Sequence, residues 1–117
     1  MPPALKLVTL KTSQPEKLKA FYECLGLQFH LEKHGKGPVH FAAELGELVF
    51  EIYPLAKEEN CSDRSLRLGF EVPESDTLLK SLAILHTPLR TPPAAMRWGN
   101  RAVVEDPDGR PVELYWS

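Results

Sequence analysis

Residues 48–54, LVFEIYP, have the pattern of a β-strand with a glutamate between two large apolar residues. The same pattern returns near the C-terminus as PVELYW, residues 111–116. An ionised carboxylate in an apolar strand is costly unless a partner compensates its charge. Glu51 and Glu113 are therefore the first candidates for a functional site.

The two glutamate strands end two copies of one pattern, β-α-β-β-β, repeated at a distance of about 60 residues. In the first copy we expect strands over residues 5–10, 27–33, 39–44 and 48–53, and a helix over 13–26. In the second we expect strands over 66–72, 101–106 and 111–116, a weak edge strand over 86–89, and a helix over 74–85. Residues 1–117 then form one domain, with module one over 4–54, a linker over 55–64 and module two over 65–117.

Each module should have one apolar and one mixed sheet face, because side chains alternate across a strand. Residues 48–53 put Phe50 and Ile52 on one face and Glu51 and Tyr53 on the other. The apolar faces should each receive a helix, which predicts an α+β fold. The mixed faces, with acids among aromatic rings, have the composition of a ligand pocket.

Composition excludes several functions. The net charge of −2 and the absence of a dense basic cluster argue against nucleic-acid binding. No apolar run approaches the roughly 20 residues of a membrane span, so we expect no membrane partner. The start, MPPALK, lacks a secretory signal, and Cys24 and Cys61 form no CxxC pair, so we expect a cytoplasmic protein with reduced thiols. A disulfide or catalytic thiol is the alternative.

Three stretches carry a resemblance to a known superfamily: LVTLKTSQPEKLKAFYECLGLQF at 7–29, LVFEIYP at 48–54 and WGNRAVVEDPDGRPVELYW at 98–116. They resemble the vicinal oxygen chelate superfamily, which includes glyoxalase I, bleomycin-resistance proteins and extradiol dioxygenases. The resemblance implies two βαβββ modules whose curved mixed sheets surround a cleft, in a homodimer. The repeat indicates the modules independently, whereas the cleft and the homodimer come from the resemblance alone.

The resemblance also implies four positions for a divalent metal, one in the first and one in the last strand of each module. The last-strand positions match Glu51 and Glu113, both competent oxygen ligands. The first-strand positions fall on Leu7, which has no donor atom, and on Arg67, which keeps its proton. We therefore expect no bound metal, with the two glutamates as remnants of a metal site.

Arg67 could replace the metal, since a guanidinium can hold two carboxylates at once. Its strand parity and the implied cleft predict that it joins Glu51 and Glu113 at the cleft floor. Removing it would then cost roughly 3–5 kcal/mol if two buried acids lose their partner. The alternatives are a solvated Arg67 paired with Glu71 or Glu44, and glutamates exposed on a sheet edge.

Other residues are candidates for the walls of the pocket. Tyr53 and Tyr115 follow the acids on the same face and either bind a ligand or end their strands. Trp98 lies in the expected loop before the penultimate strand, as a lid over the pocket or as part of the core. The histidines form no HxH or HExxH pattern, but His40 could lie near Glu51 and create a metal site outside the family pattern.

Three functions follow. The first is a metal-free protein that binds a small, partly apolar ligand through Leu7, Arg67, Tyr53, Tyr115 and Trp98. The second is a lyase or isomerase of the glyoxalase I type with Ni, Zn or Mn, in which Glu51 and Glu113 serve as ligand and base. The third is a metal-free enzyme with one glutamate as proton shuttle and Arg67 stabilising an enolate-like intermediate. A structural or interaction role is a further alternative.

Overall fold

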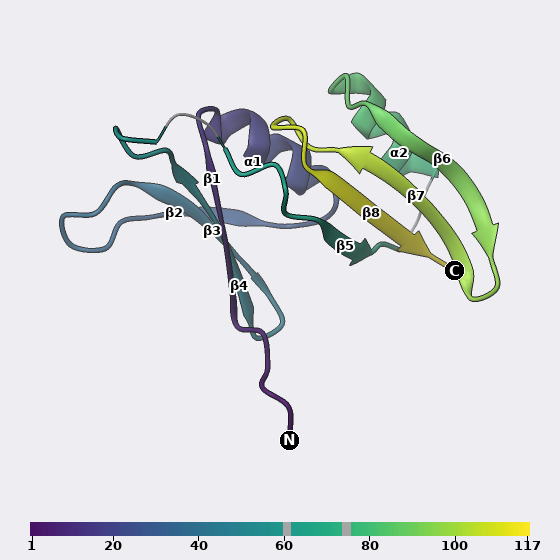
Figure 1. The fold of residues 1–117 in the computed structure, drawn as a ribbon, viewed down its shortest axis with the longest axis horizontal. Helices are drawn as coiled ribbons and strands as arrows, with labels where there is room; N and C mark the ends of the chain where they lie inside the picture. The colour runs from purple at the N-terminus through teal and green to yellow at the C-terminus, as the bar shows by residue number, and fades with distance from the viewer. Residues whose placement is uncertain (60–61, 74–75) are drawn as a thin grey trace. The chain divides into compact units, whose positions relative to one another are not determined.

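The computed structural model describes residues 1–59, 62–73 and 76–117, as two compact units (Figure 1). One unit comprises Met1–Glu23 with Leu27–Ser62, and the other Cys24–Gly26 with Asp63–Ser117. Cys61, and residues 74–75 at the predicted start of the second helix, lie outside the described residues.

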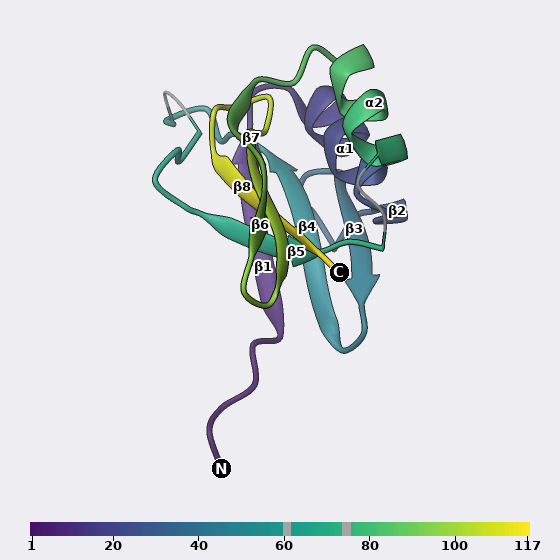
Figure 2. The same cartoon turned by 90° about the vertical axis from the view of Figure 1, so that its right-hand side faces the viewer.

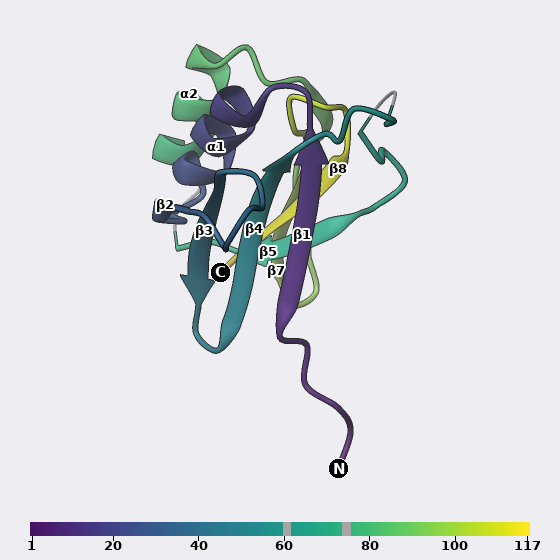
Figure 3. The same cartoon turned by 90° about the vertical axis from the view of Figure 1, so that its left-hand side faces the viewer.

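The first unit is a four-stranded mixed sheet with one helix. Its elements are β1 (Leu7–Thr12), α1 (Pro15–Cys24), β2 (Phe29–Glu32), β3 (His40–Leu45) and β4 (Leu48–Pro54). The strand order is β1-β4-β3-β2, as Figure 3 shows. β1 runs parallel to β4, and the other pairs are antiparallel.

The apolar face of this sheet is buried, as the alternation of side chains predicts. Phe50 and Ile52 are both buried, and the ring of Tyr22 in α1 lies 4.9 Å from that of Phe50. The helix thus packs on the face with Phe50 and Ile52. Glu51 and Tyr53 lie on the opposite face, which the helix does not cover.

The second unit repeats the topology. Its elements are β5 (Leu68–Glu71), α2 (Asp76–Ile84), β6 (Leu89–Met96), β7 (Gly99–Glu105) and β8 (Pro111–Trp116). The strand order is β5-β8-β7-β6, with β5 parallel to β8 and α2 on one side of the sheet (Figure 2). Two mixed sheets with two helices confirm the predicted α+β fold of repeated βαβββ topology.

The strand β6 corrects the prediction of a short edge strand followed by a proline-rich loop. It spans Leu89–Met96 and contains Pro92 and Pro93. The register with β7 shifts between Leu89 and Thr91 and again between Thr91 and Ala94. Prolines are tolerated there because β6 is an edge strand and an irregular ladder needs fewer donors. Within the described ranges, no helix is long and apolar enough to span a membrane.

Candidate functional site

The two glutamates occupy corresponding places in the two sheets. In the parallel ladders, Thr9 of β1 lies opposite Glu51, and Gly69 of β5 lies opposite Glu113. Thr9 and Gly69 are 60 residues apart, whereas Glu51 and Glu113 are 62 residues apart. The last strand of the second unit is therefore displaced by two residues in the sequence relative to the repeat of about 60 residues. The residues around each carboxylate nevertheless differ between the units.

In the second unit, Glu113 accepts three hydrogen bonds from side chains. Arg67 Nε donates to Oε2, while Arg101 Nε donates to Oε1 over 2.7 Å and the Tyr115 hydroxyl donates to Oε1 over 2.6 Å. The bonds from Arg101, Tyr115 and Arg67, in that order, lower the pKa of Glu113 to about 2. We call Arg67, Arg101, Glu113 and Tyr115 the arginine cluster. Glu113 is therefore a firmly ionised carboxylate, a poor group for accepting a proton near neutral pH.

Arg67 thus holds Glu113 of its own unit and not Glu71, and its side chain is 46% exposed. Its predicted bond to Glu51, in the other unit, stays a prediction. Arg101 was not among the candidates from the sequence. It lies on β7 opposite Tyr115, so its contact with Glu113 is diagonal across the ladder and depends on a hairpin register that the sequence leaves open.

Trp98 extends the arginine cluster by its contact with Tyr115. Their rings meet edge to face with centroids 5.2 Å apart, and Trp98 is 59% exposed in the turn between β6 and β7. The core position that was the alternative for Trp98 is therefore wrong. The bond to Glu113 is the largest cause that raises the pKa of Tyr115.

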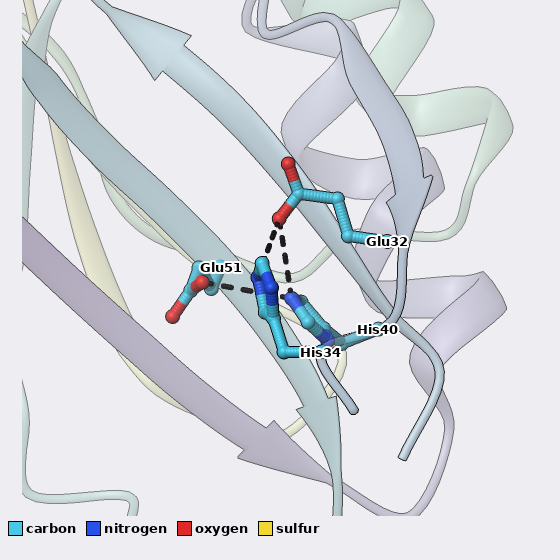
Figure 4. A group of neighbouring side chains, drawn as sticks. All are labelled: Glu32, His34, His40 and Glu51. Carbon is cyan, nitrogen blue, oxygen red and sulfur yellow. Dashed lines mark hydrogen bonds and ion pairs between the residues drawn. The ribbon is translucent and has the colours of Figure 1, made fainter. Parts of the chain in front are cut away.

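In the first unit, Glu51 belongs to a different group (Figure 4). We call Glu32, His34, His40 and Glu51 the histidine cluster; one ligand atom from each lies within 4.8 Å of the others. β2 supplies Glu32, the turn after it His34, β3 His40 and β4 Glu51. The antiparallel register puts Glu32 opposite His40.

His40 is the buried centre of this cluster, with a side chain only 1% exposed. Its Nε2 lies 3.4 Å from Glu32 Oε1 and 3.6 Å from Glu51 Oε2. Its ring stacks on Tyr53 at 4.0 Å, with planes 10° apart. Burial first, then the charges of Glu51 and Glu32, raise the pKa of Tyr53. The position of His40 beside Glu51 was one alternative from the sequence, whereas Glu32 and His34 were not expected there, because their proximity depends on the β2–β3 register.

A pocket of about 630 Å³ opens on the same face of the first sheet. It is lined by Thr9, Lys11, Pro38, Glu51, Tyr53, Pro54, Leu55, Ala56 and Lys57. Thr9 Oγ1 donates to Glu51 Oε1 over 2.9 Å, which fixes the carboxylate at the pocket wall. Of the predicted site residues, the pocket brings together Glu51 and Tyr53, while Leu7 is 55% exposed at the start of β1.

The four positions implied by the resemblance do not fit a divalent metal. Leu7 offers no ligand atom, and two guanidinium groups already occupy both oxygens of Glu113. A dication at that carboxylate would have to displace or repel Arg67 and Arg101.

No protein-family model matches the sequence, and no curated protein matches it either. Solved structures do match over nearly the whole chain. A glyoxalase/bleomycin resistance protein/dioxygenase family enzyme from Burkholderia phytofirmans PsJN has a TM-score of 0.72 at 17% identity, covering 97% of this chain and 98% of its own. The fosfomycin resistance protein FosX from Mesorhizobium loti has a TM-score of 0.72 at 18% identity, covering 98% and 92%. Lactoylglutathione lyase from Agrobacterium tumefaciens has a TM-score of 0.67 at 16% identity, covering 99% and 95%.

Identities this low carry information on the fold and not on the activity. Repeated βαβββ topology, two mixed sheets and full-length structural matches agree with the resemblance drawn from the sequence. The chain has the fold of the glyoxalase/bleomycin resistance protein/dioxygenase superfamily.

Proposed function

We propose that this chain is a small-molecule binding protein that takes a partly apolar ligand with an anionic group in the pocket of the first unit. The observation that carries the proposal is the pocket itself, about 630 Å³ in volume and adjoining Glu51 and Tyr53. That volume suits a ligand of ordinary small-molecule size.

The walls of the pocket indicate the chemistry of the ligand. Tyr53 offers a ring whose orientation is fixed by stacking on His40, and Pro54 and Leu55 add apolar surface beside it. Lys57 at the rim attracts an anionic group. Glu51 can accept a hydrogen bond from an N–H or O–H of the same ligand.

An enzymatic role for the same site would use Glu51 and not Glu113. Glu113 has its pKa held at about 2 by three donors, whereas Glu51 accepts one bond from Thr9 and lies in the pocket wall. A proton shuttle must be within reach of the substrate. We propose this metal-free enzyme only as the second candidate.

Binding can be tested with 8-anilinonaphthalene-1-sulfonate, which combines apolar rings, an N–H and a sulfonate. We expect saturable binding, measured by fluorescence, to the folded protein. Ala56→Trp should fill the pocket and weaken binding at least about tenfold. Ala83→Trp introduces the same side chain at an exposed position of α2 and should leave the affinity unchanged.

Near-UV circular dichroism shows whether both variants keep native packing, because the dye also binds partly unfolded chains. Equal affinities of the folded Ala56→Trp and Ala83→Trp variants, or no binding by the wild type, would reject the pocket as the ligand site.

A further inference from the structure

The ring of His40 has two nitrogens with different surroundings. Nδ1 lies 3.2 Å from the carbonyl oxygen of Pro38. A carbonyl only accepts hydrogen bonds, so Nδ1 carries the proton of this contact, and in the neutral ring Nε2 then has a lone pair. Nε2 is buried and has no hydrogen-bond partner among residues 1–59, 62–73 and 76–117.

This lone pair faces two carboxylate oxygens. Glu32 Oε1 and Glu51 Oε2 lie 3.4 and 3.6 Å from Nε2, and Figure 4 shows both side chains turned toward the ring. Both separations are longer than the usual range for an N–H···O bond, so a protonated His40 ring would form only weak hydrogen bonds with these carboxylates. Three electron-rich atoms that face one another are stable together when a cation lies between them.

His34 adds a fourth ligand atom. Its Nε2 lies 3.2 Å from Glu32 Oε1, and its ring centroid lies 5.2 Å from that of His40. The side chain of His34 is 70% exposed, so it can adjust to an ion without disturbing the core. The histidine cluster therefore offers two imidazole nitrogens and two carboxylate oxygens.

Three separations among these atoms match those around a tetrahedral zinc ion, and all four atoms lie within 4.8 Å of one another. Zn–N and Zn–O bonds of about 2.0–2.1 Å at tetrahedral angles place neighbouring ligand atoms about 3.4 Å apart. The three separations given above are 3.2, 3.4 and 3.6 Å. Imidazole ligands favour zinc and similar transition metals over Mg²⁺ or Ca²⁺.

The contact of His40 Nδ1 with the Pro38 carbonyl also matches the pattern of a metal-ligating histidine. Such a residue almost always donates its other N–H to a carboxylate, a backbone carbonyl or water, which fixes the ring and its tautomer. The Pro38 carbonyl is in that position, and the Tyr53 ring holds the imidazole plane from one side.

We propose that the histidine cluster is a site for one divalent transition-metal ion, Zn²⁺ being the best match. This departs from the sequence-based expectation of no metal, and it shares only Glu51 with the positions that the resemblance implies. The proposal does not depend on the ligand pocket, because the ion is measured by itself. Because Glu51 also lines the pocket, a bound ion would border the space for the ligand.

The test is calorimetric titration of the tag-free, EDTA-stripped full chain with ZnCl2. We expect one ion per chain with a Kd of about micromolar or tighter. Co²⁺ in place of zinc should give the strong visible absorption of a tetrahedral cobalt site. Zinc should also raise the Tm of the wild type, because it binds the folded state.

Two exposed neighbours of Glu32 provide matched variants. His34 and His30 both lie within ion-pair distance of Glu32, with side chains 70% and 54% exposed, but only His34 belongs to the cluster. We expect His34→Gln to weaken zinc binding at least about tenfold and Glu32→Gln at least about 100-fold, since a lost ligand should cost no less than a lost outer-shell partner. His30→Gln removes no ligand atom and keeps a side-chain donor that can reach Glu32, so its zinc affinity should fall less than that of His34→Gln.

Circular dichroism establishes that the three variants are folded, which their exposed or half-exposed positions favour. The absence of saturable zinc binding by the wild type would overturn the proposal. So would a loss of affinity in His30→Gln as large as in His34→Gln.

Discussion

Gly69 lies so close to Tyr115 that a β-carbon at position 69 would be 2.9 Å from Cε2 of the tyrosine ring. The ring therefore passes over a position without a side chain on the neighbouring strand. From there the Tyr115 hydroxyl reaches Glu113 Oε1 at 2.6 Å. In the first unit the residue at the corresponding register position is Thr9, whose own hydroxyl reaches Glu51.

Gly69→Ala should displace the Tyr115 ring and break its bond to Glu113. That bond is the largest cause of the raised pKa of Tyr115, so its loss should lower this pKa toward the ordinary value near 10. The measurement is an ultraviolet titration of phenolate formation, with Tyr115→Phe used to assign the signal. An unchanged pKa in a folded Gly69→Ala variant would show that the ring is not held by this contact.

The two arginines on Glu113 should differ in their effect on stability. Arg67 is 46% exposed and Arg101 27% exposed. Arg67→Ala should lower the free energy of unfolding by at most about 1 kcal/mol, as for other exposed ion pairs. Arg101→Ala should cost about 1.5–3 kcal/mol, the range for a hydrogen bond to a charged group.

Urea denaturation of the two variants gives the comparison. If Arg67 alone held two buried acids, its removal would lower the free energy of unfolding by roughly 3–5 kcal/mol. The expected loss is smaller because Arg101 and Tyr115 still donate to Glu113 in the Arg67→Ala variant. A loss on Arg67→Ala as large as on Arg101→Ala would contradict this order.

Glu113 should contribute to acid unfolding of the chain. Its pKa lies at about 2 in the folded state, against an ordinary value of 4.5. The folded state therefore holds this proton less readily than the unfolded chain, so the stabilisation is fully present above about pH 4.5. It is lost as the pH falls from there toward about 2.

Glu113→Gln removes this titration, so its free energy of unfolding should fall less steeply with decreasing pH than that of the wild type. Urea denaturation across the acid range, compared between the two proteins, isolates the contribution of Glu113 from that of the other acids. Parallel pH profiles would show that the carboxylate is not stabilised in the folded state.

The repeated topology was predictable because alternating strands and helical spacing are local patterns. The alternation of Phe50 and Ile52 identified the buried face of the first sheet correctly. β6 was not predictable in the same way, because Pro92 and Pro93 contradict strand propensity. Whether a strand tolerates proline depends on its place at the sheet edge, which is a property of the whole sheet.

The candidate site was predictable only where it depends on strand parity, that is, on the alternation of side chains between the two faces of a strand. Parity put Glu113, Arg67 and Tyr115 on one face, and the structure brings these three together. Arg101 joins them, and Glu32 joins His40, through hairpin registers that parity leaves open. A one-residue change of register would move either side chain to the other face of its sheet.

Arg110 is a buried charge at a turn: it follows the DPDG turn at residues 106–109 and is 1% exposed. Its Nη1 donates to Asp106 and Asp108, each over 3.0 Å. Arg110→Met should lower the free energy of unfolding by about 3 kcal/mol, the low end for a broken buried pair, since Asp106 keeps backbone donors. Arg90→Met, which removes an exposed pair with Glu105, should cost at most about 1 kcal/mol. Urea denaturation of both variants measures the two losses of unfolding free energy. Equal losses would mean that burial does not determine how much the Arg110 ion pairs stabilise the fold.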